Sequence, residues 1–367
     1  MEAKLQPARL PSLDGWRALS IILVLGCHST FTAGFPVELR TLARSVFDGH
    51  LGVRFFFCIS GFLITYLMLQ EVERTGSMSL RDFYARRALR ILPVYFLFLA
   101  VLFLLQGITA TKLTAGEWLS NLTFTVNFNA EQWKQWLNAH LWSLSVEEQF
   151  YLCWPIVFAL SGLALRRSRL LVLLALPIML IPPLRVLCYM KVLPGEGWVC
   201  KLGEALLFHV DVLAIGCGGA VIFKDHAALV KKWLCTRPAV VGCAALTLIV
   251  LPQVMLHRLW LGFFTVPFAV PCQTLGFVTL MLQSVLLPNW GVYRLLNSAP
   301  ACQLGMLSYS LYIWQQLFSA PPGTYGQNQP WWLSFPGWLL PALMVATLSH
   351  YAFERPFLAL RTRFRRG

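Results

Sequence analysis

Long runs of apolar residues alternate with short polar or basic segments along the whole chain. Ten of these runs have roughly the 20 residues that a helix needs to cross the hydrocarbon core of a bilayer. They cover residues 12–34, 51–70, 89–107, 146–165, 169–187, 204–223, 238–256, 260–286, 303–320 and 333–353. The pattern predicts an all-α polytopic membrane protein, a bundle of about ten transmembrane helices.

The composition agrees with this fold class. Of 367 residues, 57% are hydrophobic and 13% are charged, a balance too apolar for a soluble globular chain. The formal net charge of +14 would suggest nucleic-acid binding in a soluble domain. In a membrane protein the simpler explanation is Lys and Arg collected in cytoplasmic loops, so we expect no nucleic-acid partner.

The distribution of basic residues predicts the orientation. With a cytoplasmic N-terminus, the inner segments hold 19 of the 30 Lys and Arg residues and the outer loops hold seven. Cytoplasmic segments are the ones enriched in Lys and Arg, so both termini are predicted to be cytoplasmic, in agreement with an even number of spans. Residues 1–367 are interpreted as a single transmembrane domain with no appended soluble domain. No internal repeat is evident, which argues against an inverted-repeat transporter.

The cysteines are expected to be small core residues rather than disulfide or zinc ligands. Most lie within apolar runs, and no CxxC pair occurs. The residues concerned are Cys27, Cys58, Cys153, Cys217, Cys243, Cys272 and Cys302.

The first run carries three polar residues inside a membrane-length segment, LDGWRALSIILVLGCH from Leu13 to His28. On a helix, Asp14 and Arg17 are neighbours at i, i+3, and His28 follows Arg17 by three turns on the same face. This places His28 roughly 16 Å from Arg17 and about halfway through the hydrocarbon core. An imidazole at that depth is costly unless it faces protein or water, so the segment is predicted to form a functional site.

A basic stretch, RDFYARRALRILPVYF, follows the second apolar run. Arg86 and Arg90 share a helix face at i, i+4, and Arg87 also neighbours Arg90 at i+3. One interpretation is a positive-inside anchor for the third helix. The other is a phosphate site for a cytosolic ligand, next to the compact Ser60-Gly61 step of the second run. The charge pattern alone leaves both interpretations open.

The segment HLWSLSVEEQFYLCWP begins the fourth run and carries two adjacent carboxylates. Ser145 and Glu148 have the spacing of a capping box, which gives Glu148 a structural explanation. Glu147 has none, and it is one turn from Tyr151, on the helix side where Trp142 or an incoming polar substrate would be met. The alternative is that Glu147 only stabilises the helix N-terminus through the helix dipole.

The sixth run contains His209 and Asp211. Residues two apart do not face each other on a helix, so no dyad is expected, and Asp211 is predicted to pair with an arginine from another helix. No GxSxG, Walker loop, HExxH or GxGxxG motif occurs in the sequence. Serine hydrolysis, nucleotide hydrolysis and zinc-protease chemistry therefore lack support.

Six segments, in this order and at these intervals, resemble the acyltransferase 3 family of membrane O-acyltransferases. They are LDGWRALSIILVLGCH, GVRFFFCISGFLIT, FYARRALRILPVY, LWSLSVEEQFY, LGMLSYSLYIW and FERP, and they extend from residue 11 to about residue 356. The resemblance implies a ten-helix bundle in the bacterial inner (plasma) membrane. It also implies transfer of an acyl group, usually acetyl from acetyl-CoA, to a hydroxyl of a surface polysaccharide or lipid-linked glycan.

The resemblance also assigns site residues. The family's essential arginine and histidine of the first span correspond to Arg17 and His28, and its acidic residue corresponds to Glu147. The residues that correspond to its arginine motif before the third span are Arg86, Arg87 and Arg90.

Two positions depart from the family pattern. His209 stands where members often have Arg, and Gln315 stands where many have His, which puts any role of these two sites in doubt. The extracellular hydrolase-like domain that some members carry after the bundle is missing from this sequence. Transfer is therefore expected to be completed by the membrane domain itself or handed to a partner.

The predicted mechanism docks acyl-CoA from the cytoplasm, with its phosphates on the three arginines and its pantetheine arm directed toward His28. The acceptor sugar would enter from the outer side, past Trp142 and Glu147. Glu147 is predicted to act in catalysis, either by positioning the acceptor hydroxyl or by hydrogen-bonding the imidazolium. His28 is the side chain suited to take a hydroxyl proton at neutral pH, either as a base or as a covalent acyl carrier. The other residues predicted to bind substrate are Arg17, Asp14, Ser60 and Tyr151.

No metal and no permanently bound cofactor is expected, because acetyl-CoA serves as a donor substrate. The rival interpretation is a secondary transporter or flippase for a polar glycolipid, in which His28 and Asp211 relay protons. A third interpretation, a non-catalytic membrane scaffold, leaves the buried His and Arg without an evident use.

Overall fold

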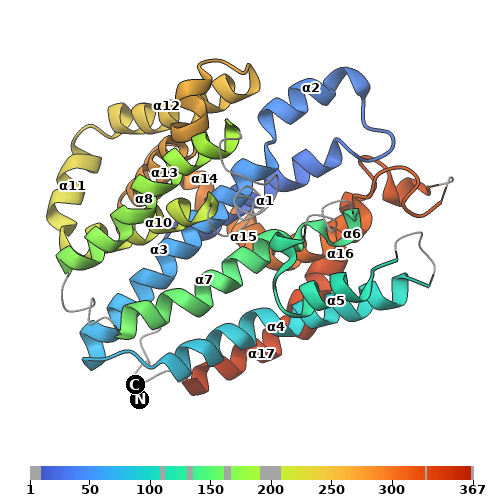
Figure 1. The fold of residues 1–367 in the computed structure, drawn as a ribbon, viewed down its shortest axis with the longest axis horizontal. Helices are drawn as coiled ribbons and strands as arrows, with labels where there is room; N and C mark the ends of the chain where they lie inside the picture. Colours follow the sequence, from blue (N-terminus) through green and yellow to red (C-terminus); the bar gives the residue numbers. More distant parts are fainter. Residues whose placement is uncertain are drawn as a thin grey trace.

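A computed structural model describes residues 10–107, 112–129, 135–160, 167–190, 208–326 and 329–364. Within these ranges every regular element is a helix, apart from one isolated bridge between Gly323 and Gly326. The prediction of an all-α protein is therefore confirmed, and Figure 1 shows the helices arranged as a bundle.

Each of the ten predicted apolar runs overlaps one main helix. These are α1 (Leu13–Ser29), α3 (Gly49–Thr75), α4 (Leu80–Leu105), α7 (Leu141–Leu160), α8 (Arg167–Tyr189), α10 (Phe208–Asp225), α12 (Pro238–His257), α13 (Gly262–Leu286), α15 (Ala299–Phe318) and α16 (Leu339–Leu348).

Shorter helical elements connect the main helices. The α-helical ones are α2 (Val37–Val46), α5 (Ala115–Leu122), α6 (Trp136–Ala139), α11 (Ala227–Thr236), α14 (Tyr293–Leu296) and α17 (Arg355–Leu360). The others are the 3₁₀ turns η1 (Val126–Phe128), η5 (Trp331–Leu333) and η7 (Arg361–Phe364) and the π-helical η6 (Ser349–Glu354).

Five segments are long and apolar enough to cross a bilayer: Val37–Thr75, Leu80–Leu105, Arg167–Tyr189, Pro238–His257 and Gly262–Leu286. A sixth span results if α10 and α11, which are bent by 104° at their junction, count as one broken segment. The chain is thus a multi-pass membrane protein. The full count of ten spans stays a prediction, because helices such as α1 and α16 are shorter and α7 carries polar residues.

The hairpin of α3 and α4 follows from local sequence signals. Asp48 accepts a hydrogen bond from the backbone N–H of Leu51 at 2.7 Å and so caps the start of α3. Gly76, with φ of 75°, ends α3, and Ser79 then caps α4 by accepting from the N–H of Asp82 at 3.3 Å. This short connection places the end of α3 beside the start of α4, where Glu71 accepts from the backbone N–H of Ser79 at 3.0 Å.

Close packing through glycine fixes α3 against α10. A Cβ added at Gly61 would lie 2.3 Å from the carbonyl oxygen of Leu213, and one added at Gly216 would lie 2.3 Å from that of Cys58. Gly305 of α15 meets the backbone of Asp14 in α1 in the same way. Figure 1 shows α1 and α3 at the centre of the bundle, with α8, α10, α12 and α13 on one side and α4, α15 and α17 on the other.

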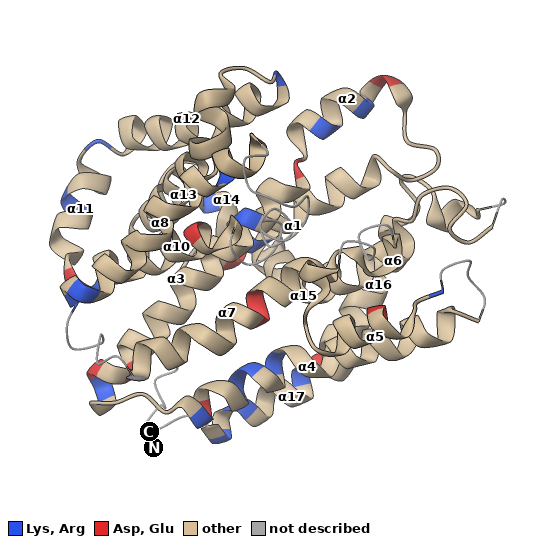
Figure 2. Cartoon of the chain, viewed as in Figure 1, with Lys and Arg blue, Asp and Glu red and all other residues tan. Residues whose placement is uncertain are grey.

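Ion pairs gather the ends of several helices at one end of the bundle. Arg86 pairs with Glu71 at 2.8 Å, and Arg167 and Lys224 both pair with Glu73. The end of α3, the starts of α4 and α8, and the end of α10 therefore lie together. Figure 2 shows basic residues along the first half of α4 and beside α17. Consecutive membrane helices are expected to run in opposite directions, and the ion pairs agree with this because they join helix ends to helix starts. The cytoplasmic placement of the termini stays a prediction.

Some predicted inner residues lie outside the described part of the chain: Lys4, Arg9, Arg166, Arg365 and Arg366. The expectation for the cysteines is confirmed for Cys58 and Cys217, which are buried. It is wrong for Cys153 and Cys243, whose side chains are exposed on apolar helix faces. An apolar run with a lipid-facing side presents its small residues outward as readily as inward, so hydrophobic context alone did not separate the two cases.

Candidate active site

A cavity of about 80 Å³ lies between α1, α3, α4, α7 and α15. That volume is enough for a few waters or a group of acetyl size. Its polar lining consists of Arg17, Ser60, Arg87, Arg90, Ser143, Glu147, Tyr151 and Ser308, and aromatic and aliphatic side chains of α3, α4, α7 and α15 line the rest. Six of these residues were predicted from the sequence to bind substrate or act in catalysis, and the fold brings them together from four helices. We call this space the inner cavity.

Glu147 is held at the wall of the inner cavity by two hydroxyl groups. Ser60 of α3 and Tyr151 of α7 both donate to Glu147 Oε1, and the Tyr151 hydroxyl also donates to Ser60 Oγ at 3.1 Å. The predicted capping box of Ser145 and Glu148 is wrong. Because α7 already begins at Leu141, the Ser145 hydroxyl donates back to the Leu141 carbonyl at 3.0 Å inside the helix.

The arginines give the inner cavity an excess of positive charge. Arg17 pairs with Asp14 at 3.2 Å, as its i, i+3 spacing predicted. Arg87 stacks its guanidinium over the Tyr151 ring at 4.7 Å. Within the described residues, no carboxylate lies within 4.0 Å of the guanidinium of Arg87 or Arg90. Two unpaired guanidinium groups in one cavity form a site that favours an anion.

The structure divides the arginine motif between the two interpretations left open by the sequence. Arg86 points away from the inner cavity, pairs with Glu71 at 2.8 Å and donates to the Phe364 carbonyl at 2.7 Å. It therefore anchors α4 to α3 and η7. Arg87 and Arg90, three residues apart on α4, line the cavity instead.

His28 lies outside the inner cavity, near the far end of α1. Its Nδ1 is 2.9 Å from Gln315 Oε1, and the Ser319 hydroxyl donates to the same oxygen at 3.0 Å. The ring edge packs on Trp136 with centroids 5.3 Å apart. An Nδ1–H that donates to Gln315 leaves Nε2 as the basic nitrogen.

A thin wall separates His28 from the inner cavity. Tyr312 of α15 lines the cavity and bonds the Ser143 hydroxyl, and it also donates to the carbonyl of His140 at 3.1 Å. Gln315, the partner of His28, follows Tyr312 by three residues, a rise of about 4.5 Å. His140 is buried beside this wall, with its two ring nitrogens next to Gln316 Oε1 and the Ile313 carbonyl of α15.

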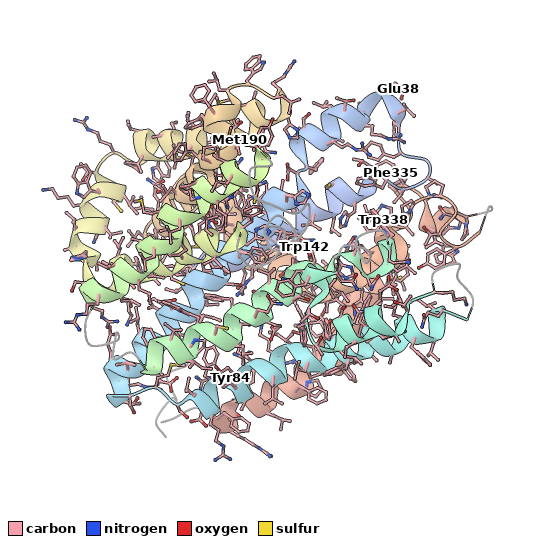
Figure 3. All side chains as sticks on the ribbon, in the orientation of Figure 1. Glu38, Tyr84, Trp142, Met190, Phe335 and Trp338 are labelled. Atoms are coloured by element: carbon pink, nitrogen blue, oxygen red, sulfur yellow. The ribbon has the colours of Figure 1, made fainter. Side chains whose placement is uncertain are left out.

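Trp142, His209 and Asp211 lie in a separate polar cluster. Trp142, labelled in Figure 3, is buried and packs on His209 with centroids 5.1 Å apart. Asp211 receives two hydrogen bonds from Arg185, both of 2.8 Å, which confirms that it pairs with an arginine. Arg54 bonds Gln273 nearby. Asp14 and Trp142 were predicted to bind substrate, but neither lines the inner cavity. Asp14 contacts the cavity residue Arg17 instead.

The sequence is similar to a known protein family and to several curated proteins. A protein-family model described as an acyltransferase domain matches residues 10–365, nearly the whole chain. The chain belongs to this acyltransferase family. No solved structure matches it significantly.

The chain is also similar to curated proteins. It is 27% identical over 377 residues to "O-acetyltransferase OatA" of Staphylococcus aureus (strain NCTC 8325 / PS 47), which covers 97% of the chain and 58% of that protein. It is 27% identical over 378 residues to "Putative peptidoglycan O-acetyltransferase YrhL" of Bacillus subtilis (strain 168), covering 95% and 54%. A shorter match, 31% identical over 159 residues, is to "Peptidoglycan O-acetyltransferase OatA" of Listeria monocytogenes, covering 40% and 24%. The chain thus spans a little over half the length of the first two relatives.

Several residues of this site were given no role from the sequence. Tyr312 and Ser143 were not assigned, and Gln315 was noted only as a departure from the family pattern. They stand at the wall and at His28, and they contact residues far away along the chain. The LGMLSYSLYIWQQLF segment did show a Ser- and Tyr-rich face, which suits helix packing and a polar cavity wall equally. Helix pairing was the missing information, because periodicity places a side chain on a face without naming its partner.

Proposed function

We propose that this chain is an integral membrane O-acetyltransferase that moves an acetyl group from cytosolic acetyl-CoA to a hydroxyl of a cell-wall glycan. The proposal includes ten spans with both termini cytoplasmic. Family membership and the printed names of the relatives support the reaction class. The observation that carries the donor site is the pair of guanidinium groups, Arg87 and Arg90, that face one cavity without a carboxylate partner among the described residues.

The donor would bind at the inner cavity. Bidentate contacts from Arg87 and Arg90 suit the phosphates of coenzyme A, since planar guanidinium groups match phosphate geometry. Arg17, paired with Asp14, stands at the same cavity and is assigned to the thioester or the pantetheine arm. Glu147 accepts hydrogen bonds from Ser60 and Tyr151, so we assign it to positioning of Tyr151, whose ring packs against Arg87.

His28 would act as the base. Its Nε2 takes the proton of the acceptor hydroxyl while the acceptor oxygen attacks the thioester carbonyl carbon. The C–S bond then breaks, and the coenzyme A thiolate receives the proton from the imidazolium. Transfer through a covalent acyl-histidine would use the same nitrogen. Either route requires the Tyr312–Ser143 contact to open, since that contact stands between the inner cavity and Gln315.

The experiment is an acetyl-transfer assay with purified protein, radiolabelled acetyl-CoA and a peptidoglycan glycan acceptor. Wild type should move label to the glycan, and His28→Ala should reduce transfer by at least about 100-fold while keeping the thermal stability of wild type. His257→Ala, at an exposed histidine of α12, is the matched control and should keep full transfer. Undiminished transfer by the His28 variant would refute the assignment of the base.

A further inference from the structure

An open groove of about 730 Å³ lies where α1 ends, outside the site already described. We call it the outer groove. Residues 30–37 form one side of it, Arg40 and Arg44 of α2 form another, and Pro322 closes it. The groove begins at Thr30, two residues after His28. Phe335, labelled in Figure 3, holds the loop of residues 30–37 in place. The Phe335 N–H donates to the Ala33 carbonyl at 2.8 Å, and the Phe335 ring packs on the Phe35 ring with centroids 4.7 Å apart.

The outer groove is at the opposite end of the bundle from the Arg86–Glu71 pair. α2 leads directly into the start of α3, whereas Glu71 lies near the end of α3. A helix of 27 residues spans about 40 Å. The inner cavity lies between these two ends, because its lining on α3 runs from Val53 to Leu63.

Positive charge in the outer groove has no acidic partner. Arg40 and Arg44 share a helix face at i, i+4, and both line the groove. No carboxylate of the described residues lies within 4.0 Å of either guanidinium, and the Nε of Arg40 is buried without a hydrogen-bond partner. Glu38, labelled in Figure 3, is the one acidic residue between positions 30 and 46, and it is exposed and does not line the groove.

Aromatic contacts connect the outer groove to the imidazole. Arg44 lies over the Phe31 ring at 4.6 Å and donates from Nε to Thr30 at 3.1 Å. Phe31 packs on Trp136 with centroids 5.3 Å apart, and Trp136 packs on His28 at 5.3 Å. These contacts connect Arg44 to His28 through the rings of Phe31 and Trp136.

The other face of α2 is apolar. Leu39, Leu42 and Val46 are 52%, 63% and 56% exposed on it. An amphipathic helix with exposed apolar residues on one face and arginines on the other lies in the membrane interface. With α2 in the membrane interface, Arg40 and Arg44 face the groove. At this depth a polymer outside the membrane can contact both arginines.

We propose that the outer groove is the acceptor subsite, and that it takes a glycan bearing carboxylate groups. Two guanidinium groups four residues apart bind carboxylates through paired hydrogen bonds. Phe31 lines the groove and would pack on the C–H face of a sugar ring, and Trp136, which contacts both Phe31 and His28, connects this position to the imidazole. An anionic lipid headgroup would also bind arginines at an interface. Lipid binding would not explain the ring contacts that connect Phe31 through Trp136 to His28. This inference rests on the proposed function, because it names the substrate class of the same reaction.

The test compares two acceptors in vesicles made only of zwitterionic phosphatidylcholine. One is an oligosaccharide of alternating N-acetylglucosamine and N-acetylmuramic acid with free lactyl carboxylates, and the other is the same oligosaccharide with those carboxylates amidated. Arg40→Gln and Arg44→Gln should each raise the KM for the acidic acceptor about tenfold, leaving kcat and the KM for acetyl-CoA unchanged. The KM for the amidated acceptor should not move. Arg258→Gln, at the exposed arginine that directly follows α12 on the same end, is the control and should match wild type.

Binding of the acidic oligosaccharide without acetyl-CoA separates this inference from the proposed function. Arginine-dependent binding in a protein that transfers no acetyl group would support the groove and refute the proposed reaction. Transfer with the same KM in wild type and both variants would refute the groove and leave the reaction intact. Equal losses for both acceptors, or losses that occur only when phosphatidylglycerol is added to the vesicles, would also overturn the assignment, the latter in favour of a lipid site.

Discussion

Gln315 holds the imidazole of His28 through the Nδ1 to Oε1 contact of 2.9 Å, and Ser319 donates to the same oxygen. If His28 is the base, this contact fixes the proton on Nδ1 and directs Nε2 to the acceptor. Gln315→Leu should therefore lower kcat about tenfold or more, with little change in the KM for acetyl-CoA. Gln315→Glu keeps the acceptor oxygen and should retain more activity than the leucine variant.

Steady-state acetyl transfer with both substrates varied measures this effect, and a melting curve of each variant excludes unfolding. A purely structural Gln315 would make leucine and glutamate variants lose activity in proportion to their stability. Wild-type kcat in a folded Gln315→Leu protein would show that the imidazole needs no partner at this position.

The division of the arginine motif predicts different outcomes for neighbouring residues. Arg87→Ala and Arg90→Ala each remove an unpaired guanidinium from the inner cavity and should raise the Kd for acetyl-CoA about tenfold. Arg86→Ala breaks the pair with Glu71 and the contact with η7, so it should lower thermal stability and leave the Kd nearly unchanged. Arg81→Ala, at an exposed position of α4, controls for the loss of one charge. Isothermal titration calorimetry with acetyl-CoA measures the Kd of each variant. Equal changes in Kd for all four variants would mean that only the net charge of the protein matters.

Sequence spacing predicted pairings within one helix better than pairings between helices. The Asp14–Arg17 neighbours were correct because i, i+3 geometry is fixed by the helix itself. The two arginines that line the cavity are Arg87 and Arg90, at i, i+3. Arg86 shares a helix face with Arg90 at i, i+4 but does not line the cavity. Which face points inward depends on the neighbouring helices, and no single segment contains that information.

At the scale of helices, the contact of α3 with α10 supports the inner cavity, because Ser60 directly precedes Gly61. Gly216→Leu would drive a side chain into the backbone of α3, where even a Cβ comes within 2.3 Å of the Cys58 carbonyl. We expect a loss of about 1–3 kcal/mol of stability and a larger loss of activity. Gly218→Leu, in the same helix with nothing within 4 Å of its Cβ, is the matched control and should fold like wild type.

Thermal unfolding in detergent and acetyl transfer at low temperature measure the two effects separately. Equal stability of the two glycine variants would mean that α3 and α10 yield to the added side chain. In that case the position of Ser60 would not depend on close helix contact.

Hydrophobic runs predicted the existence of the main helices but not their exact bounds or partners. The fourth run was placed at residues 146–165, whereas α7 covers Leu141–Leu160, and this shift is what made the capping box wrong. Polar residues such as Ser143 and Ser145 hid the true start of the helix, because a buried helix tolerates serines that bond back to its own carbonyls. α2 was not predicted at all, since its ten residues are too few for a span.

At the scale of the whole molecule, the proposed reaction needs two compartments to meet at one imidazole. The inner cavity and the outer groove lie on opposite sides of His28, and each has arginines without carboxylate partners among the described residues. The transporter interpretation has less support, because Arg185 engages both oxygens of the Asp211 carboxylate and His28 contacts Gln315. A proton relay between His28 and Asp211 would first have to break both contacts.

The orientation of the bundle is the last prediction. If the end that holds Arg86 is cytoplasmic, a cysteine at Arg81 should react with a membrane-impermeant maleimide only after the cells are permeabilised. A cysteine at Glu38, exposed on α2 at the other end, should react in intact cells. The parent protein, which keeps its native cysteines, gives the background, and Cys153 and Cys243 are the exposed thiols to watch in it. The reverse pattern would put Arg87 and Arg90 outside the cell, where acetyl-CoA is absent, and would rule out a cytosolic donor at the inner cavity.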